Sequence, residues 1–153
     1  MTLTICQDDL SGDQTRALLA LHLAGMRDGS PPGHSFALDS SGLQQPDVTV
    51  WTAWNGEAVA GICALKQHDG SRGELKSMRT HPDFLRRGVG AALLEHAIAE
   101  ARSRGLSVLS LETGSGATFE AALALYRNRG FKDGAAFADY RPSDFNQFLH
   151  LAL

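Results

Sequence analysis

The sequence lacks the features of several specialised classes of protein. Its 153 residues contain no run approaching the roughly 18 apolar residues that cross a bilayer, and residues 1–9 show neither the basic nor the apolar part of a secretory signal. Its only cysteines, Cys6 and Cys63, form no CxxC pair, and its histidines show no HxxxH or HxH spacing. We therefore expect a cytoplasmic protein with no membrane span, no disulfide framework and no metal site.

The chain also has no excess of positive charge. Its 14 Lys and Arg residues stand against 17 Asp and Glu residues, for a formal net charge of -3. Because a nucleic-acid partner requires a basic face, this balance argues against one. Hydrophobic residues make up 43% of the chain, which is ordinary for a globular protein. The length favours a single domain over residues 1–153 with a real hydrophobic core.

Hydrophobic periodicity and turn signals predict a mixed chain of helices and strands. The strands are expected at residues 2–7, 48–54, 58–66, 73–81, 106–113, 131–140 and 145–153. The helices are expected from a Ser11–Gln14 capping box to about Met26, from Val89 to a stop at Gly105, and from a Ser115 cap to Gly130. The run at 106–113 is typical of a buried parallel strand and completes a strand, helix, strand unit. Residues 27–45 contain Pro and Gly breaks, which predict either a binding loop or a surface connection.

The strand expected at residues 73–81 is polar on both faces. Glu74 and Lys76 share one face, while Ser77 and Arg79 share the other with Leu75. A strand of this kind in the middle of a sheet indicates a wet cleft, whereas at an edge it would only be solvated.

The stretch from Leu85 to Ala91 opens the most clearly amphipathic helix of the chain. Gly88 and Gly90 let the backbone approach a ligand, and the N–H groups at a helix start lack internal partners, so that they attract anions. Arg86 and Arg87 could contact the same anion or only solvate the loop. Taken alone, the stretch fits either a phosphate site or a plain turn.

Three groups of residues give the chain a resemblance to a known family. The pyrophosphate loop of the GCN5-related N-acetyltransferase (GNAT) superfamily is similar to Arg87-Gly88-Val89-Gly90-Ala91, which follows His81-Pro82. The end of that family's helix after the fifth strand resembles Ala122–Tyr126 with Gly130-Phe131. Glu74 stands fourteen residues before Gly88, where many members have their general base.

This resemblance covers nearly the whole chain. It implies an α/β (α+β) fold, in which a mixed central sheet of about six to seven strands has flanking helices and splays between its fourth and fifth strands. Residues 110–115 and 137–140 resemble a bacterial branch with poorly defined small-molecule substrates. Two positions depart from the family pattern, which has Arg or Gln where this chain has Leu85 and often Asn where it has Phe119. A hydrogen bond to the pantetheine arm would then be lost, or supplied by Thr113 or Ser115.

The resemblance implies an N-acetyltransferase that moves an acetyl group from acetyl-CoA to a primary amine of a small molecule by direct attack, without a metal. Glu74 would take the proton, with Glu112 in reserve, a backbone N–H near Met78 or Arg79 would face the oxyanion, and Tyr126 would protonate or stabilise the thiolate. From the residues alone, Glu74 could instead pair with Lys76, and Tyr126 could belong to the core. Contacts to coenzyme A are implied at Met78, Arg79, Thr80, Arg86, Arg87, Gly88, Val89, Gly90, Ala91, Phe119 and Tyr126.

The acceptor amine is expected between the irregular segment and the end of the chain. Its candidate contacts are His34, Phe36, Glu112, Asp139 and Tyr140. An acetyltransferase of peptide or protein amines, a non-catalytic acyl-CoA-binding or sensor module, and a homodimer all stay open. A nucleotide-binding βαβ protein is disfavoured, because Leu93 stands in place of the third glycine of that motif.

Overall fold

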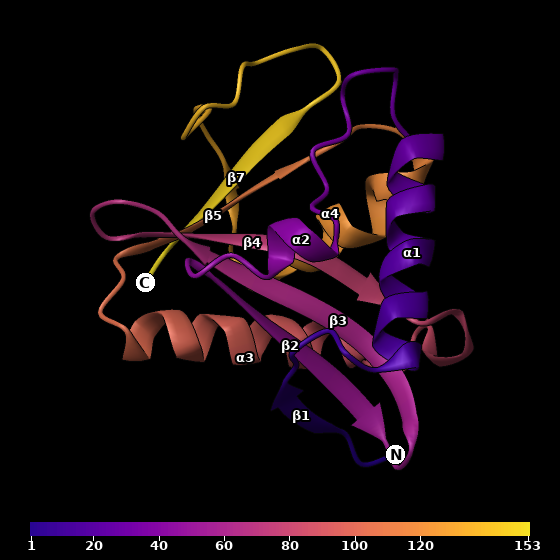
Figure 1. The fold of residues 1–153 in the computed structure, drawn as a ribbon. Helices are drawn as coiled ribbons and strands as arrows, with labels where there is room; N and C mark the ends of the chain where they lie inside the picture. Colours follow the sequence, from indigo (N-terminus) through magenta and orange to yellow (C-terminus); the bar gives the residue numbers. More distant parts are fainter.

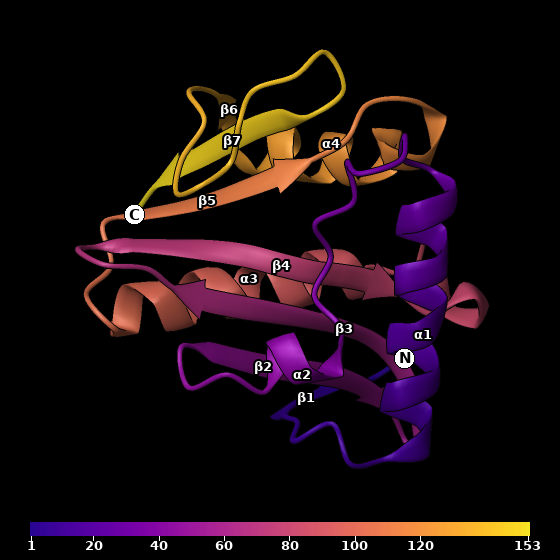
Figure 2. The ribbon, with the colours of Figure 1, turned by 45° about the horizontal axis from the view of Figure 1, so that its top comes forward.

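A computed structural model describes residues 1–153 as a mixed seven-stranded sheet with helices on both faces (Figures 1 and 2). The strands are β1 (Thr4–Gln7), β2 (Val48–Asn55), β3 (Ala58–Gln67), β4 (Arg72–Thr80), β5 (Val108–Thr113), β6 (Lys132–Asp133) and β7 (Gln147–Ala152). The helices are α1 (Asp13–Asp28), α2 (Ser40–Leu43), the short 3-10 helix η1 (Pro82–Phe84), α3 (Val89–Ser103) and α4 (Ala117–Arg129). The strand order is β1-β2-β3-β4-β5-β7-β6, and only the β4–β5 pair is parallel. The predicted mixed fold is confirmed.

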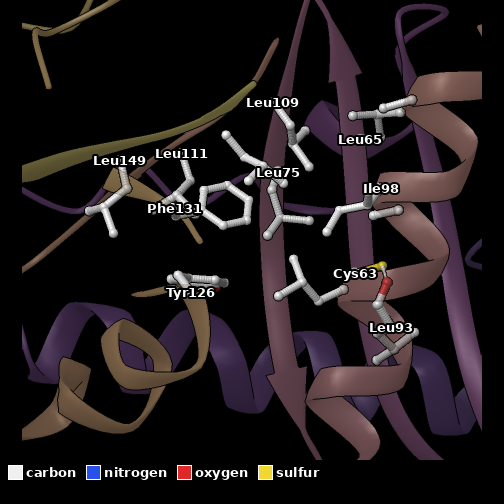
Figure 3. Close-up of a cluster of buried hydrophobic side chains, with 14 of the residues drawn as sticks. Cys63, Leu65, Leu75, Leu93, Ile98, Leu109, Leu111, Tyr126, Phe131 and Leu149 are labelled. Atoms are coloured by element: carbon white, nitrogen blue, oxygen red, sulfur yellow. Dashed lines mark hydrogen bonds between the residues drawn. The ribbon is translucent and has the colours of Figure 1, made fainter. Parts of the chain in front are cut away.

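Each face of the sheet carries its own hydrophobic core. On one face, α1 and α2 cover β2 and β3 through eight buried residues that include Leu18, Leu43 and Ile62. On the other face, α3 and α4 pack through a larger cluster that includes Leu93 and Tyr126, part of which is drawn in Figure 3. Since a large apolar side chain contributes about 1.5–3 kcal/mol when buried, these layers hold the helices firmly against the middle strands. No helix combines the length and hydropathy needed to cross a bilayer.

The two middle strands separate part-way along their length. β4 and β5 pair only from Arg72 with Val108 to Glu74 with Ser110, although β4 continues to Thr80 and β5 to Thr113. Figure 2 shows the two ribbons diverging beyond this point. The predicted splay between the fourth and fifth strands is therefore present, and it opens the sheet on its polar strand.

A β-bulge interrupts β4 just beyond the last paired residues. Ala64 of β3 pairs with Lys76 and Ile62 pairs with Arg79, so that two residues of β4, Ser77 and Met78, stand opposite one residue of β3. Ser77 has a positive φ of 55°, and its buried hydroxyl has no hydrogen-bond partner. Bulges of this kind bend a strand and redirect its backbone groups, and they recur beside active sites.

Both predicted side-chain caps are wrong. Gly12 caps α1 without a side-chain bond, because the hydroxyl of Ser11 donates to Asp9 and the amide of Gln14 instead bonds the backbone of residues 57 and 59. Gly116 caps α4, because the hydroxyl of Ser115 donates to the carbonyl of Phe145 across 2.6 Å. Gln14 and Ser115 are thus taken up by tertiary partners, whereas Ser11 is taken up by Asp9, two residues before it.

The predicted strand at residues 131–140 is also mostly wrong. Only Lys132–Asp133 pairs with β7, and the chain then leaves the sheet in a loop that returns at β7. The irregular segment at residues 27–45 contains the short helix α2, whose first residues are capped by the carboxylate of Asp39. β5 begins at Val108 rather than at residue 106.

Candidate active site

A cavity of about 640 Å³ lies where β4 and β5 separate. It runs from the start of α3, along the bulged half of β4, to Glu112 at the end of β5, with α4 and the segment before α2 as its other walls. The predicted cofactor residues that line it are Met78, Arg79, Thr80, Arg86, Gly88, Val89, Gly90, Ala91, Phe119 and Tyr126. Arg87 is not among the lining residues, and its guanidinium instead lies over the Phe84 ring at 5.8 Å from the centroid.

The start of α3 forms the end of this cavity. Arg86 and Gly88 have positive φ angles of 60° and 82°, and these turn the loop sharply into the helix. The first helical hydrogen bond joins the N–H of Ala92 to the carbonyl of Gly88, so the preceding N–H groups have no acceptor within the helix. The first turn of α3 contains no acidic residue. Free amides, the positive end of the helix dipole and Arg86 thus make this end of the cavity suited to an anion.

The bulged half of β4 forms one long wall, and His22 and Met26 of α1 line the cavity beside it. The guanidinium of Arg79 donates from Nε to Nδ1 of His22 across 3.0 Å. His22 is buried, and burial, reinforced by the charge of Arg79, lowers its pKa to about 4. His22 is therefore neutral near pH 7, which leaves Nδ1 free to accept, and the pair fixes Arg79 on the wall.

Glu112 stands on the opposite wall, at the end of β5. It is only partly exposed, and burial raises its pKa to about 7, while the charge of Lys76 lowers it and that of Glu74 raises it further. A carboxyl with a pKa near neutrality can both accept and release a proton at physiological pH. Glu112 is the acidic residue that lines this cavity.

Glu74 lies deeper and is fully engaged by neighbouring groups. Its side chain is 2% exposed, and its carboxylate accepts from Lys76 Nζ at 3.2 Å, from Tyr140 Oη at 2.5 Å and from His68 Nε2 at 2.8 Å. Three neighbouring donors already occupy this buried carboxylate and leave few of its lone pairs free for another partner. Both the pairing with Lys76 and the burial of Glu74 in the sheet distinguish it from Glu112.

A second cavity, of about 770 Å³, lies on the other side of Glu74. Its walls are polar, and they come from the segment before α2, the β3–β4 turn and the loop before β7. The predicted acceptor residues His34 and Phe36 line both cavities, whereas Asp139, Tyr140 and Glu74 line the second. Four of the predicted acceptor residues thus line one cavity. The fifth, Glu112, lines only the first cavity.

Tyr126 and Phe119 project from α4 into the first cavity. Tyr126 is 6% exposed and packs beside Phe131, and burial raises the pKa of its phenol. Figure 3 shows the two rings together at the edge of the core. Phe119 is 5% exposed and packs edge-on against Phe145 with ring centroids 5.6 Å apart. Of the two residues considered for a pantetheine hydrogen bond, Thr113 lines the cavity, while Ser115 is occupied by Phe145.

Several lining residues escaped sequence reasoning. Lys76 was considered only as a partner of Glu74, yet it lines the first cavity, and Lys66 and Asn146 line the second. The alternating polar pattern of β4 carried a signal for Lys76. The bulge at Ser77 had no local signal, because it depends on the pairing of β4 with β3.

A family model described as the acetyltransferase (GNAT) family matches residues 16–131. The chain belongs to this family. Among similar GNAT proteins, the uncharacterized N-acetyltransferase YedL of Escherichia coli K12 is 50% identical over 150 residues, which cover 98% of this chain and 94% of YedL. The IAA acetyltransferase of Azospirillum brasilense is 35% identical over 125 residues, which cover 80% of each chain.

The fold of the chain is similar to solved acetyltransferase structures. A GNAT-like match is the acetyltransferase of Bacillus subtilis in complex with CoA, which superposes with a TM-score of 0.75 at 21% identity and covers 99% of each chain. The resemblance inferred from the glycine loop is therefore confirmed, and this GNAT chain is an acyltransferase. The acceptor that it uses is a separate question, which its two cavities address.

Proposed function

We propose that the protein is a cytoplasmic enzyme that transfers the acetyl group of acetyl-CoA to a primary amine of a small polar molecule. The observation that carries the proposal is a single cavity that joins an anion seat, a β-bulge, a carboxyl with a near-neutral pKa and a tyrosine. Acid–base chemistry, an oxyanion site and a proton donor for a thiolate are the three needs of acetyl transfer to an amine.

Coenzyme A fits the end of the cavity at α3. Its pyrophosphate would bind the free amides at the start of α3, with Arg86 adding charge, since the first turn of that helix has no acid that would repel it. The pantetheine arm would lie in the split beside Met78 and Thr80, where Phe119 offers an apolar contact in place of the family's asparagine. Thr113 is the residue free to offer this arm a hydrogen bond.

Glu112 would serve as the general base. It lines the cavity that holds the proposed thioester, and its raised pKa makes its basicity match a proton transfer near pH 7. Glu74, the base implied by the family spacing, lines the other cavity and already accepts three hydrogen bonds. It stays the alternative base, and the variants below separate the two.

The remaining groups would act on the thioester itself. A backbone N–H of the bulge near Met78 would face the carbonyl oxygen as it gains negative charge. The amine nitrogen forms a bond to the carbonyl carbon, the carbon–sulfur bond breaks, and the amine proton passes to Glu112. The hydroxyl of Tyr126 would donate a hydrogen bond or a proton to the departing sulfur.

The acceptor would enter through the second cavity. The cavity is lined mainly by polar side chains, and it shares the lining residues His34 and Phe36 with the first. Phe36 and Tyr140 pack edge-on at 5.5 Å and form part of this passage. A polar acceptor would place its body beside Tyr140 and Asp139 and its amine near Glu112.

A thiol-release assay with acetyl-CoA and a panel of small amines tests the proposal. We expect turnover with at least one small amine, a loss of kcat by about 100-fold or more in Glu112→Gln and Tyr126→Phe, and CoA affinity close to that of the wild type. Glu120→Gln is a matched control, because Glu120 is exposed on α4 and lies outside both cavities.

Three results would contradict parts of the proposal. If no amine is acetylated while acetyl-CoA binds, the chain is a binding module of its family. If only peptides with free amines are acetylated, the acceptor class is wrong. If Glu74→Gln abolishes turnover and Glu112→Gln does not, the base is Glu74.

A further inference from the structure

We propose that Lys76 is a positioning residue, whose ammonium is held by Glu74 and Tyr140 on the wall between the two cavities and sets the protonation of Glu112. The inference rests on the proposed role of Glu112 as the base. It assigns a purpose to the buried cluster of Lys76, Glu74, Tyr140 and His68, which catalysis as proposed above does not use.

The cluster holds the side-chain nitrogen of Lys76 in one place. Lys76 Nζ donates to Glu74 Oε2 at 3.2 Å and to Tyr140 Oη at 2.7 Å, while Tyr140 Oη donates to Glu74 Oε2 at 2.5 Å. His68 Nε2 lies 2.8 Å from Glu74 Oε1. These bonds are satisfied together when Glu74 accepts from its three neighbours and Tyr140 Oη accepts from Lys76 while it donates to Glu74. The side chain of Lys76 is 9% exposed, so solvent screens its charge weakly.

The aromatic side chains around Tyr140 keep this arrangement rigid. The ring of Tyr140 packs against Phe137, Phe36 and Phe148, with centroids 5.2, 5.5 and 6.0 Å away. Lys76 Nζ lies 5.5 Å from the centroid of the same ring. A lysine held in this way loses the freedom that lets an exposed lysine swing into water.

The sheet places this ammonium in the split between the strands. The parallel pairing of β4 with β5 ends at Glu74, and the bulge begins at Ser77, so that Lys76 lies between the two irregularities. Lys76 lines the first cavity together with Glu112, while its partners Glu74 and Tyr140 line the second. The ammonium therefore acts on the cavity in which acetyl transfer is proposed.

Two opposite charges act on Glu112 from β4. Lys76 favours the ionised carboxylate and Glu74 opposes it, in agreement with the directions in which they move its pKa. The other titratable or charged side chains that line the first cavity are His22, His34, Arg79, Arg86 and Tyr126. Those that line only the second cavity, besides Glu74, are Asp47, Lys66, His68, Asp69, Asp139, Tyr140 and Arg141. Removing Lys76 should thus leave Glu112 protonated at a higher pH, and removing the charge of Glu74 should do the reverse.

The pH dependence of kcat/KM separates this role from simple packing. Relative to the wild type, we expect Lys76→Met to move the acidic limb up by about one pH unit, Glu74→Gln to move it down, and Lys76→Arg to leave it near its place. At a pH below the limb, Lys76→Met should lower kcat/KM by about ten-fold, with the loss shrinking above the limb. His34→Gln should not move the limb, whatever it does to the rate.

The result that overturns the inference is a limb that stays in place in Lys76→Met, or one that moves in the same direction in Lys76→Met and Glu74→Gln. CoA binding and thermal unfolding show whether each variant is folded. If Lys76→Met does not fold, Lys76→Arg provides a folded comparison that keeps the positive charge. If the limb survives in Glu112→Gln, the base assignment itself is wrong. If the limb disappears in Glu112→Gln but keeps its position in Lys76→Met, only the role of Lys76 is wrong.

Discussion

Gly88→Glu tests the anion seat at the start of α3 more directly than any other single change. Gly88 has a φ of 82°, and a Cβ built there meets no atom within 4 Å. A glutamate thus has room for its side chain, and its carboxylate would stand at the free amides where a pyrophosphate is proposed to bind. Gly105 offers a matched control, because it has a φ of 75° and equally open space beyond the other end of the same helix.

Gly88→Glu and Gly105→Glu should lose the same amount of stability but should differ in their affinity for CoA. A non-glycine residue in the left-handed region costs about 1–2 kcal/mol, less about 0.4–1 kcal/mol regained from the unfolded chain. For a protein of 153 residues, a net loss near 1 kcal/mol lowers Tm by about 3 °C. We expect this fall in both Gly88→Glu and Gly105→Glu without ligand.

Only Gly88→Glu should weaken the binding of coenzyme A. Two like charges about 4 Å apart repel by about 4 kcal/mol at the effective dielectric of a protein surface, so a rise in Kd of at least ten-fold is a conservative expectation. At a CoA concentration 100 times the wild-type Kd, ligand stabilises the wild type by about 2.7 kcal/mol, and a ten-fold weaker variant by about 1.4 kcal/mol.

Thermal unfolding with and without CoA, together with calorimetric titration, measures both effects. If Gly88→Glu binds CoA as tightly as Gly105→Glu does, the pyrophosphate binds elsewhere. If both variants lose affinity equally, the loss reflects strain in α3 rather than charge at its start.

Three further changes test the supports of the site. His22 has a pKa of about 4 in the folded protein, against about 6.5 in the unfolded chain. Its contribution to the free energy of unfolding should therefore be complete above pH 6.5 and should fall by about 3 kcal/mol as the pH drops to 4. In denaturant titrations, His22→Gln should reduce this dependence of stability on pH. Gly61→Ala should cost about 1–3 kcal/mol by chemical denaturation, since its Cβ would lie 2.7 Å from a Val89 side-chain atom. Gly12→Ala, with nothing within 4 Å, should cost only the loss of a preferred N-cap residue, about 0.5–1 kcal/mol. Phe119→Asn should cost about 3 kcal/mol despite matching the family residue, and a neutral result would show that Phe119 does not support the wall.

Patterns within short stretches of the chain were enough to predict much of the secondary structure and the position of one end of the candidate site. The Asn55-Gly56 hairpin and the amphipathic α3 both occur where local chemistry predicts them. The glycine loop at residues 88–90 predicts an anion seat, because a helix start and the left-handed Gly88 depend on neighbouring residues only. The family resemblance rested on this loop together with residues 122–131 and Glu74.

Tertiary contacts decided what the local patterns left open. Gln14 and Ser115 lost their predicted capping roles to partners that only folding brings near. The order of strands placed Glu74 among three donors and Glu112 in the open split, although each reads in sequence as an acidic residue on a strand.

The difference between these two carboxylates arises from separations that no spacing rule covers. Tyr140 lies 66 residues from Glu74, and Glu112 faces β4 across a parallel pairing that ends at Ser110. Burial, charge and hydrogen-bond partners set the protonation of a carboxyl, and each of them is a property of the folded neighbourhood. The residue types at the site can therefore be identified from the sequence, while the role of each of them is decided by the folded structure.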